Sequence, residues 1–294
     1  MKDSFKDEHR KVAESSNTNF LYSFSVLSGE KNDALNTIYA FCRKTDDIVD
    51  NDKHSPDEKL KNLDEWREKF TKAISGIYED TFIEKVDLIR RKFSIPVEPF
   101  HDLIDGMEMD IKKNRFNDFS ELKEYCYKVA ATVGLMCLEV FGYHSQDTKK
   151  YAMNLGVALQ LTNIMRDVKT DSVKNRIYLP LDEMAKFGYT EKMLFENKYN
   201  REFRDLMNYQ YKRAERYYDI ANSYLKSEDK GLMVSAKIME EIYHKILLKI
   251  KALSYDVLNY DVKLSKFTKV RIAIVTLYKY KLLYNAEDPR REFQ

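Results

Sequence analysis

An all-α fold is the class that the sequence predicts, and three observations indicate it. The chain has 294 residues but only 8 Gly and 5 Pro, roughly a third of average usage, whereas sheet-rich folds need such turn residues often. Apolar residues make up 44% of the chain, which is enough for a sizeable core. They recur at the spacing of an α-helix. Sandwiches, barrels and collagen-like arrays are therefore excluded in practice.

The same spacing places the helices in order along the chain. Leu35, Ile38, Tyr39 and Cys42 share one face of a helix that leads into an acidic stretch. Further helices are expected near residues 57–75, 80–93, 97–113, 119–141, 149–171, 200–227, 232–258 and 264–284. Because proline and glycine end helices, breaks are expected at Ser28-Gly29, Ser55-Pro56, Ile95-Pro96, Gly142 and Leu179-Pro180. Neither a linker nor a repeat divides the chain, which predicts a single domain over residues 1–294 with a frayed tail at 285–294.

The charge and the cysteines limit the partners and the compartment. Lys and Arg number 50 against 48 Asp and Glu, a net charge of +2, which argues against a nucleic-acid partner. Cys42, Cys126 and Cys137 are odd in number and lack zinc-like spacing, as is typical of a reduced cytosol. The first residues lack the apolar segment of a signal peptide, and no run approaches the ~18 apolar residues of a membrane span. We therefore expect a cytoplasmic protein.

The first candidate functional motif is an acidic helix end with Asp46, Asp47 and Asp50. Asp46 and Asp50 lie one helical turn apart on the same face, where like charges repel unless a cation lies between them. Carboxylate oxygens favour Mg²⁺, which keeps several waters and shares ligands with a substrate phosphate. Arg43, one turn earlier, is placed to bind the same anion. A solvated acidic helix end without a ligand is the alternative.

A second polar stripe strengthens the interpretation as a metal site. Asn163, Asp167 and Asp171 follow one another at four-residue spacing, so their oxygen atoms form one row along two helical turns. The segment before them is apolar and expected to be buried, and carboxylates that face inward are costly unless they are paired or bind metal. Two such helices facing one another across a cavity would hold magnesium ions on a diphosphate.

Four segments resemble, in the right order, the motifs of the squalene/phytoene synthase family of head-to-head prenyl transferases. They are Tyr39-x-x-Cys42-Arg43-Lys44-x-Asp46-Asp47-x-x-Asp50, Tyr125-Cys126-Tyr127-x-Val129-Ala130-x-Thr132-Val133-Gly134, Leu159-Gln160-x-x-Asn163-Ile164-x-Arg166-Asp167-x-x-x-Asp171 and Asn175-Arg176-Ile177-Tyr178-Leu179-Pro180. The resemblance extends over most of the chain. It implies a single-domain helical bundle of the isoprenoid synthase type around a central cavity, with the two aspartate motifs facing each other at its mouth. It also implies a transferase of isoprenoid biosynthesis that joins two identical allylic diphosphates head to head through a cyclopropyl diphosphate intermediate.

The resemblance also implies roles for single residues. Those that look like Mg²⁺ ligands are Asp46, Asp50, Asn163, Asp167 and Asp171, with Asp47 supporting them. Those that look like diphosphate contacts are Arg43, Arg166, Arg176 and Tyr243. The residues that would line the reaction centre are Tyr39, Tyr127, Tyr178 and Gln160. The catalytic set would be Asp46, Asp50, Asp167, Asp171, Tyr39 and Tyr127.

The chemistry of the reaction agrees with these roles. Ionising an allylic diphosphate produces a carbocation and a highly charged leaving group, which Mg²⁺ and Arg neutralise without a covalent nucleophile. An apolar cavity keeps water from the cation, and aromatic faces stabilise it. Tyr127 lies beside the small residues Ala130, Ala131 and Gly134, which fits a helix lining a tunnel. Close packing of two helices would explain these small residues equally well.

Two segments depart from the family pattern. Family members often have Ser-x-Ser-Phe near the N-terminus, where this chain has Asn17-Thr18-Asn19-Phe20. We expect Asn17 and Asn19 to donate to phosphate oxygens instead. Many relatives carry a basic residue five or six positions after the equivalent of Tyr255, where this chain has Tyr260 and Asp261, with Lys263 and Lys266 just beyond. Either a lysine replaces that contact or the site lacks it.

The length of the donor is predicted from two aromatic residues. Phe20 and Phe24 are four residues apart on the expected first helix, so both rings can face the cavity and fill volume that a twenty-carbon tail would need. This favours farnesyl diphosphate and a squalene or dehydrosqualene product, with NADPH as a cofactor if the product is squalene. Packing of both rings in the core is the alternative. The alternative functions are a phytoene synthase that uses geranylgeranyl diphosphate, a class I terpene cyclase and a non-catalytic helical scaffold.

A greasy product also suggests a loose, peripheral contact with a membrane. The basic and aromatic residues Phe267, Lys269 and Arg271 are the expected contact. The sequence makes no prediction about the oligomeric state.

Overall fold

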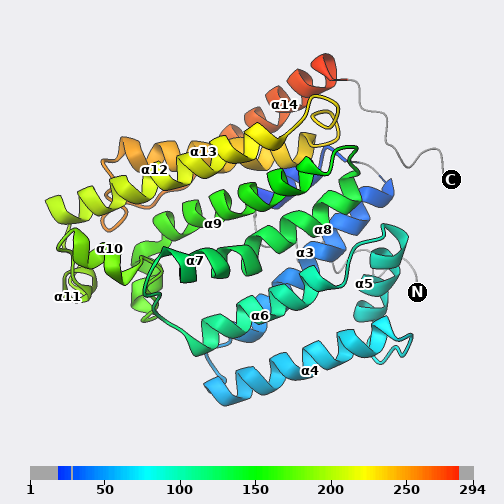
Figure 1. The fold of residues 1–294 in the computed structure, drawn as a ribbon, viewed down its shortest axis with the longest axis horizontal. Helices are drawn as coiled ribbons and strands as arrows, with labels where there is room; N and C mark the ends of the chain where they lie inside the picture. The colour runs from blue at the N-terminus through cyan, green and yellow to red at the C-terminus, as the bar shows by residue number, and fades with distance from the viewer. Residues whose placement is uncertain (1–18, 28, 285–294) are drawn as a thin grey trace.

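The structure, a computed structural model, describes residues 19–27 and 29–284. Over these residues the chain forms α-helices and one π-helix (Figure 1), with no strand beyond an isolated bridge between Arg115 and Ile177. The helices are α2 (Asn19–Phe24), α3 (Gly29–Val49), α4 (Pro56–Ile74), α5 (Thr81–Lys92), α6 (Glu98–Lys112), α7 (Phe119–Cys126), η1 (Tyr127–Ala131), α8 (Thr132–Phe141), α9 (Asp147–Val173), α10 (Leu181–Lys186), α11 (Glu191–Phe195), α12 (Arg201–Tyr224), α13 (Val234–Ala252) and α14 (Lys266–Leu283). The all-α prediction is confirmed. Asn17 and the predicted tail at 285–294 lie outside the described residues.

The ends of the helices follow the local sequence. α4 begins after Ser55, whose hydroxyl accepts a hydrogen bond from the Glu58 N–H, while the Glu58 carboxylate accepts one from the Ser55 N–H. This reciprocal cap satisfies two N–H groups that the first turn leaves unpaired. Asn200 caps α12 with its side chain alone. Gly142, whose φ of 81° suits a residue without a side chain, ends α8.

Two regions differ from the predicted helices. The helix expected at 232–258 is α13, which ends at Ala252, because Ser254 (φ 53°) and Tyr255 (φ 69°) adopt left-handed backbone angles that a right-handed helix cannot contain. The short helices α10 and α11 have no counterpart among the predictions. Five or six residues are too few to show a helical period in the sequence.

The helix expected at 119–141 is continuous but not regular. Between α7 and α8 the five residues Tyr127–Ala131 form a π-helix. A π turn holds one residue more than an α turn. Side chains on α8 are therefore rotated, relative to those on α7, by the angle of about one residue, ~100°.

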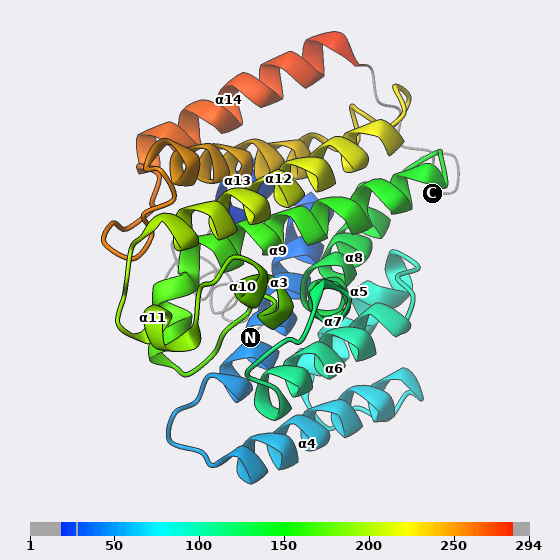
Figure 2. The ribbon, with the colours of Figure 1, turned by 60° about the vertical axis from the view of Figure 1, so that its left-hand side comes forward.

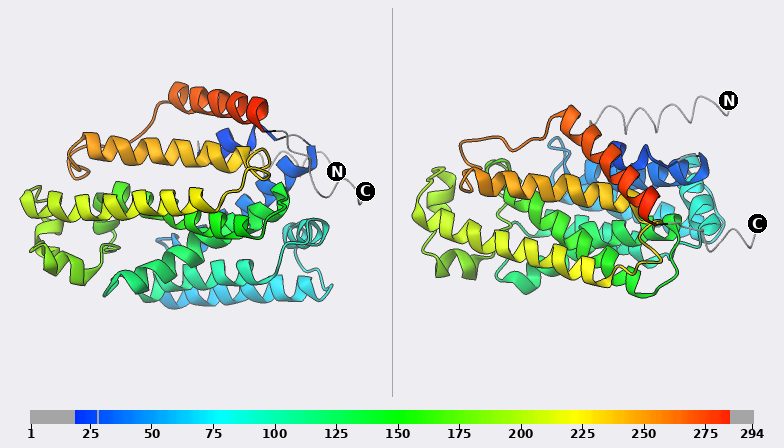
Figure 3. Two further views of the ribbon diagram at one scale, coloured as in Figure 1. Left: turned by 45° about the horizontal axis from the view of Figure 1, so that its top comes forward. Right: turned by 90° about the horizontal axis from the view of Figure 1, so that it is seen from above.

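The helices are arranged in layers (Figures 1 and 2). α4, α5 and α6 form one side, α3, α8 and α9 lie in the middle, and α12, α13 and α14 form the other side. α9 contacts α8, η1, α12 and α13, so it is the central helix of the bundle. α14 lies outside α13 at the edge of the molecule (Figure 3) and packs against α13 and α2.

Small residues allow α9 to approach η1 and α8 closely. A Cβ atom added to Gly156 of α9 would lie 2.6 Å from the Ala131 Cα, and one added to Gly134 of α8 would lie 2.9 Å from the Ala152 carbonyl oxygen. Both distances are shorter than side chains tolerate. Since Ala130, Gly134 and Gly156 also line the cavity described below, the small residues serve close packing and the cavity wall together.

No helix in the described ranges is both long enough and apolar enough to cross a lipid bilayer.

Candidate active site

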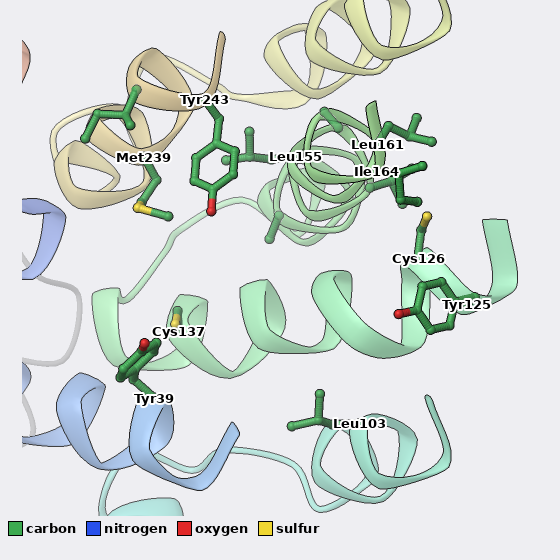
Figure 4. Packing of buried hydrophobic residues seen from close by; sticks show 14 of the residues in the cluster. Tyr39, Leu103, Tyr125, Cys126, Cys137, Leu155, Leu161, Ile164, Met239 and Tyr243 are labelled. Carbon is green, nitrogen blue, oxygen red and sulfur yellow. The ribbon is translucent and has the colours of Figure 1, made fainter. Parts of the chain in front are cut away.

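A cavity of about 530 Å³ runs through the middle of the bundle. Its walls come from α2, α3, α6, α7, η1, α8, α9 and α13 and from the segment after α9. One end is charged and contains the two acidic motifs. The other end is apolar, and Figure 4 shows Tyr39, Cys137, Leu155, Met239 and Tyr243 around the interior space. The cavity therefore joins a charged mouth to an apolar interior.

The first acidic motif lies at the C-terminal end of α3. Asp46 and Asp50 line the cavity, whereas Asp47 is not among the lining residues and forms an ion pair with Arg43 (Nη2–Oδ1, 2.7 Å). Arg43 also contacts Asp46 (Nη1–Oδ2, 2.9 Å). Burial, and then the neighbouring charge of Asp50, raises the pKa of Asp46 to about 6 despite Arg43. The charge of Arg43 is therefore not enough to offset the effects of burial and of Asp50 on this carboxylate.

The second acidic motif lies on α9 and faces the same mouth. Asn163, Asp167 and Asp171 all line the cavity. Burial, followed by the charge of Asp167, raises the pKa of Asp171 to about 7. Arg166 donates to Asp167 (Nε–Oδ1, 2.8 Å). Both motifs thus hold pairs of carboxylates that disfavour each other's charge, as predicted from their four-residue spacing.

Arg176 joins the two motifs across the mouth. It follows α9 in the chain and donates to Asp50 at the end of α3 (Nη1–Oδ1, 3.1 Å), with Lys174 Nζ at 3.4 Å from the other carboxylate oxygen. Burial alone would raise the pKa of Asp50, but the hydrogen bonds and charges of Arg176 and Lys174 outweigh it and lower the pKa. The two motifs are therefore close enough to act on one ligand.

Asp110, on α6, is a cavity residue that the sequence analysis missed. Its carboxylate accepts hydrogen bonds from the hydroxyls of Tyr178 (2.6 Å) and Tyr125 (2.8 Å). Burial raises the pKa of Asp110 even though these two hydroxyls favour its charged form. Its charge also raises the pKa values of Asp46 and Asp171. Asp110 therefore lies within electrostatic range of both motifs.

Tyr127, which the resemblance assigns to the reaction centre, lies differently from its neighbour Tyr125. Tyr125 lines the cavity, whereas Tyr127 is not among the described residues that do so, and its pKa is raised by burial and by Asp102. In a regular α-helix Tyr127 would share a face with Gly134, seven residues on. The extra residue of the π-helix shifts that register and brings Tyr125 to the cavity face instead. Figure 4 shows the Tyr125 hydroxyl directed into the interior space.

The remaining predicted residues fall into two groups. Those that line the cavity are Tyr39, Arg43, Gln160, Arg166, Arg176, Tyr178, Tyr243, Phe20 and Phe24. Asn19 is not among the described lining residues, although its side-chain oxygen is buried without a hydrogen-bond partner. At the apolar end, the rings of Phe20 and Phe24 lie 5.6 Å apart, and Phe20 lies 5.1 Å from the Tyr39 ring.

The segment that departs from the family pattern lies at the surface. Tyr260 is 59% exposed, and Lys263 pairs with Asp261 at the surface. Lys269, on the inner face of α14, instead lies over the Tyr22 ring at 5.5 Å. Its pKa is lowered by burial and then by the charge of Arg166, so Lys269 lies within electrostatic range of Arg166.

The donor atoms at the mouth fit Mg²⁺. The Asn163 side-chain oxygen is buried and has no hydrogen-bond partner, and the carboxylate pairs Asp46–Asp50 and Asp167–Asp171 include members with raised pKa values. A hard cation would satisfy the amide oxygen and remove the repulsion. Within the described ranges no three His, Cys, Asp or Glu side chains are arranged to hold a metal ion by themselves. Diphosphate and water oxygens would complete the coordination, as is usual for Mg²⁺.

An all-α bundle whose apolar cavity opens between two acidic helices defines an enzyme of the isoprenoid synthase type. The family model described as squalene/phytoene synthase matches residues 13–268. A phytoene synthase of Arthrospira platensis is 37% identical over 254 residues, 82% of each chain, and the 15-cis-phytoene synthase of Synechococcus elongatus is 34% identical over 266 residues, 85% of each chain. A crystal structure of a dehydrosqualene synthase in complex with ligand superposes with a TM-score of 0.82 at 27% identity, covering 93% of this chain and 95% of that one. The chain belongs to the squalene/phytoene synthase family of head-to-head prenyl transferases.

Proposed function

We propose that the protein is a Mg²⁺-dependent phytoene synthase that condenses two molecules of geranylgeranyl diphosphate head to head through a cyclopropyl diphosphate intermediate. The observation that carries this proposal is the identity of 37% and 34% to two phytoene synthases over more than four fifths of the chain. Geranylgeranyl diphosphate therefore replaces farnesyl diphosphate as the favoured donor, because both of these relatives are phytoene synthases.

The charged mouth would bind the diphosphate of the donor. Mg²⁺, held by Asp46, Asp50, Asn163, Asp167 and Asp171, would supply the positive charge that makes diphosphate a good leaving group. Arginines at the mouth would contact the phosphate oxygens directly. Arg176 already bridges to Asp50 at 3.1 Å, so the two acidic helices are held at a fixed separation before a ligand binds.

The apolar end would hold the hydrocarbon tails and protect the carbocation. Residues such as Leu155, Met239 and Phe24 make this part of the wall largely apolar, which disfavours water there. The Tyr39 and Phe20 rings, 5.1 Å apart, present aromatic faces to the same space, and aromatic faces stabilise cations.

A farnesyl-using dehydrosqualene or squalene synthase is the second candidate. The observation in its favour is the pair Phe20 and Phe24, whose rings line the cavity at the apolar end and reduce its length. The similarity to a dehydrosqualene synthase structure, at 27% identity, agrees with it. This candidate is supported less strongly, because the chain is 27% identical to the dehydrosqualene synthase and 37% and 34% identical to the two phytoene synthases.

The test is to incubate the purified protein with each diphosphate and identify the hydrocarbon by mass. We expect phytoene from geranylgeranyl diphosphate, in the absence of NADPH, and no product after EDTA treatment. A thirty-carbon product formed from farnesyl diphosphate alone would support the second candidate, and NADPH dependence would identify it as squalene. A cyclic product from a single donor would contradict both and indicate a terpene cyclase.

A further inference from the structure

α14 carries a disproportionate share of the exposed apolar side chains. Of the fourteen large hydrophobic residues that are exposed in the described chain, seven lie on this one helix: Phe267, Val270, Ile274, Val275, Tyr278, Leu282 and Leu283. Single exposed apolar residues are ordinary, but a contiguous group of this kind indicates a contact surface.

The exposed residues form one stripe that faces away from the protein. Phe267, Ile274, Tyr278 and Leu282 repeat at helical spacing and are 78%, 51%, 65% and 80% exposed. The opposite face, with Ala273, Thr276 and Tyr280, is buried, where α14 packs against α13 and α2. The helix is therefore apolar on both faces but covered on only one, and Figures 2 and 3 show it at the outer edge of the molecule.

The charge on α14 indicates the chemistry of the partner. The helix contains Lys266, Lys269, Arg271, Lys279 and Lys281 and no acidic residue, although Lys and Arg almost balance Asp and Glu in the whole chain, 50 to 48. Arg271 lies within the apolar stripe, and Lys266 and Lys279 are exposed beside it. An apolar helix face with cations beside it is the pattern of helices that lie in the interface of anionic bilayers.

We propose that this stripe, formed by Phe267, Arg271, Ile274, Tyr278 and Leu282, docks on an anionic lipid bilayer. A second copy of the chain fits less well, because a two-fold contact would place the stripe against itself and its cations would face one another. The helix would lie along the surface, since it carries too many charges to span a bilayer.

Docking here would place the apolar end of the cavity beside the membrane. α14 packs against α2 and α13, and these helices supply Phe20, Phe24, Ala236 and Met239 to the cavity wall. This step, the release of product into the bilayer, rests on the proposed function, since it needs a hydrocarbon product. The docking itself depends only on the stripe and its charges.

Vesicle flotation with matched variants tests the proposal. The protein is mixed with vesicles of phosphatidylcholine alone or with a quarter phosphatidylglycerol, and the bound fraction is measured at low and high salt. One variant removes apolar contact (Phe267→Ser/Ile274→Ser/Leu282→Ser), and a second removes charge (Arg271→Gln/Lys279→Gln). The control, Ile77→Ser/Leu88→Ser, changes two other exposed residues, 57% and 54% exposed, on the far side of the molecule near α5.

The expected result is salt-sensitive binding of the wild type to the anionic vesicles. Both α14 variants should bind at least tenfold more weakly, whereas the control should bind like the wild type. All variants should keep wild-type circular dichroism and, in detergent solution, wild-type turnover if the proposed function holds. Failure of the wild type to bind, or equal binding by all variants, would overturn the proposal. So would light scattering that shows a dimer which the apolar variant dissociates, because α14 would then contact a second copy. Because binding is measured without substrate, its outcome is separate from that of the proposed function.

Discussion

The hydroxyl of Tyr125 is expected to contribute to stability and catalysis, whereas the hydroxyl of Tyr127 is not. Tyr125→Phe removes a donor, 2.8 Å from a partly buried Asp110 oxygen, and leaves that carboxylate with Tyr178 as its remaining tyrosine donor. A hydrogen bond to a charged group contributes ~1.5–3 kcal/mol, so the free energy of unfolding should fall by about that amount. At roughly 2 °C per kcal/mol the melting temperature should fall by roughly 3–6 °C.

Turnover should show the same difference between Tyr125→Phe and Tyr127→Phe. A loss of this size in the transition state would lower kcat/KM roughly ten- to 150-fold. The matched control is Tyr127→Phe, two residues away, whose hydroxyl lies outside the cavity and which should change stability by no more than ~0.5 kcal/mol. Thermal unfolding and steady-state hydrocarbon formation measure both effects. A loss for Tyr127→Phe as large as that for Tyr125→Phe would refute the register that the π-helix imposes.

The effect on stability should also depend on pH. Burial already raises the pKa of Asp110 in the folded state, and loss of the Tyr125 donor would raise it further, since that hydrogen bond favours the carboxylate. A carboxyl with a raised folded-state pKa binds its proton more tightly when folded, so stability decreases as the pH rises toward that pKa. Tyr125→Phe should therefore cost less stability in mildly acidic buffer than in mildly alkaline buffer. A loss that is independent of pH would show that Asp110 is not the partner that matters.

Three further predictions follow from the mouth and the walls of the cavity. Asp46→Ala or Asp167→Ala should cut turnover at least ~100-fold, and near wild-type turnover at saturating Mg²⁺ would refute the metal assignment. Asp46→Ala should do so without lowering the melting temperature, because the Asp46 pKa of about 6 shows that its charge opposes folding. Gly156→Ala places a Cβ 2.6 Å from the Ala131 Cα, so urea unfolding should show a net loss of ~1–2 kcal/mol after the gain in helix propensity; a stabilised variant would contradict the close approach. Phe24→Ala opens the apolar end, where the ring is 4% exposed, so the ratio of geranylgeranyl to farnesyl turnover in a competition assay should rise; an unchanged ratio would show that this ring does not limit the tail.

The parts of the site that repeat at helical spacing could be predicted from the sequence. Asn163, Asp167 and Asp171 lie on one helix, α9, and line the cavity together, because four-residue spacing in a regular helix fixes a common face. The outlines of the long helices were predictable for the same reason, since their apolar faces and their proline and glycine boundaries are local signals.

Residues placed by packing or by irregular backbone could not be predicted in this way. Asp110 is one of several acidic residues on α6, and it becomes a site residue because Tyr125 and Tyr178, 15 and 68 residues away in sequence, donate to it. The family resemblance assigns Tyr127 to the reaction centre, whereas Tyr125 lines the cavity, and the π-helix that follows Tyr125 has no signal of its own in the sequence. The choice between these tyrosines depends on contacts that a single segment does not contain.

The π-helix also decides where this wall of the cavity can gain or lose a residue. Tyr125 and Gly134 are nine residues apart, which in a regular α-helix places them on opposite faces, yet both line the cavity. Deleting one residue within Tyr127–Ala131 would convert the wide turn into an ordinary α turn and leave both residues on the cavity side. The same deletion anywhere within α7 or α8 would rotate one flank by ~100° and turn its lining residues away. Changes in chain length along this wall are therefore expected to be tolerated within η1 and to be selected against on either side of it.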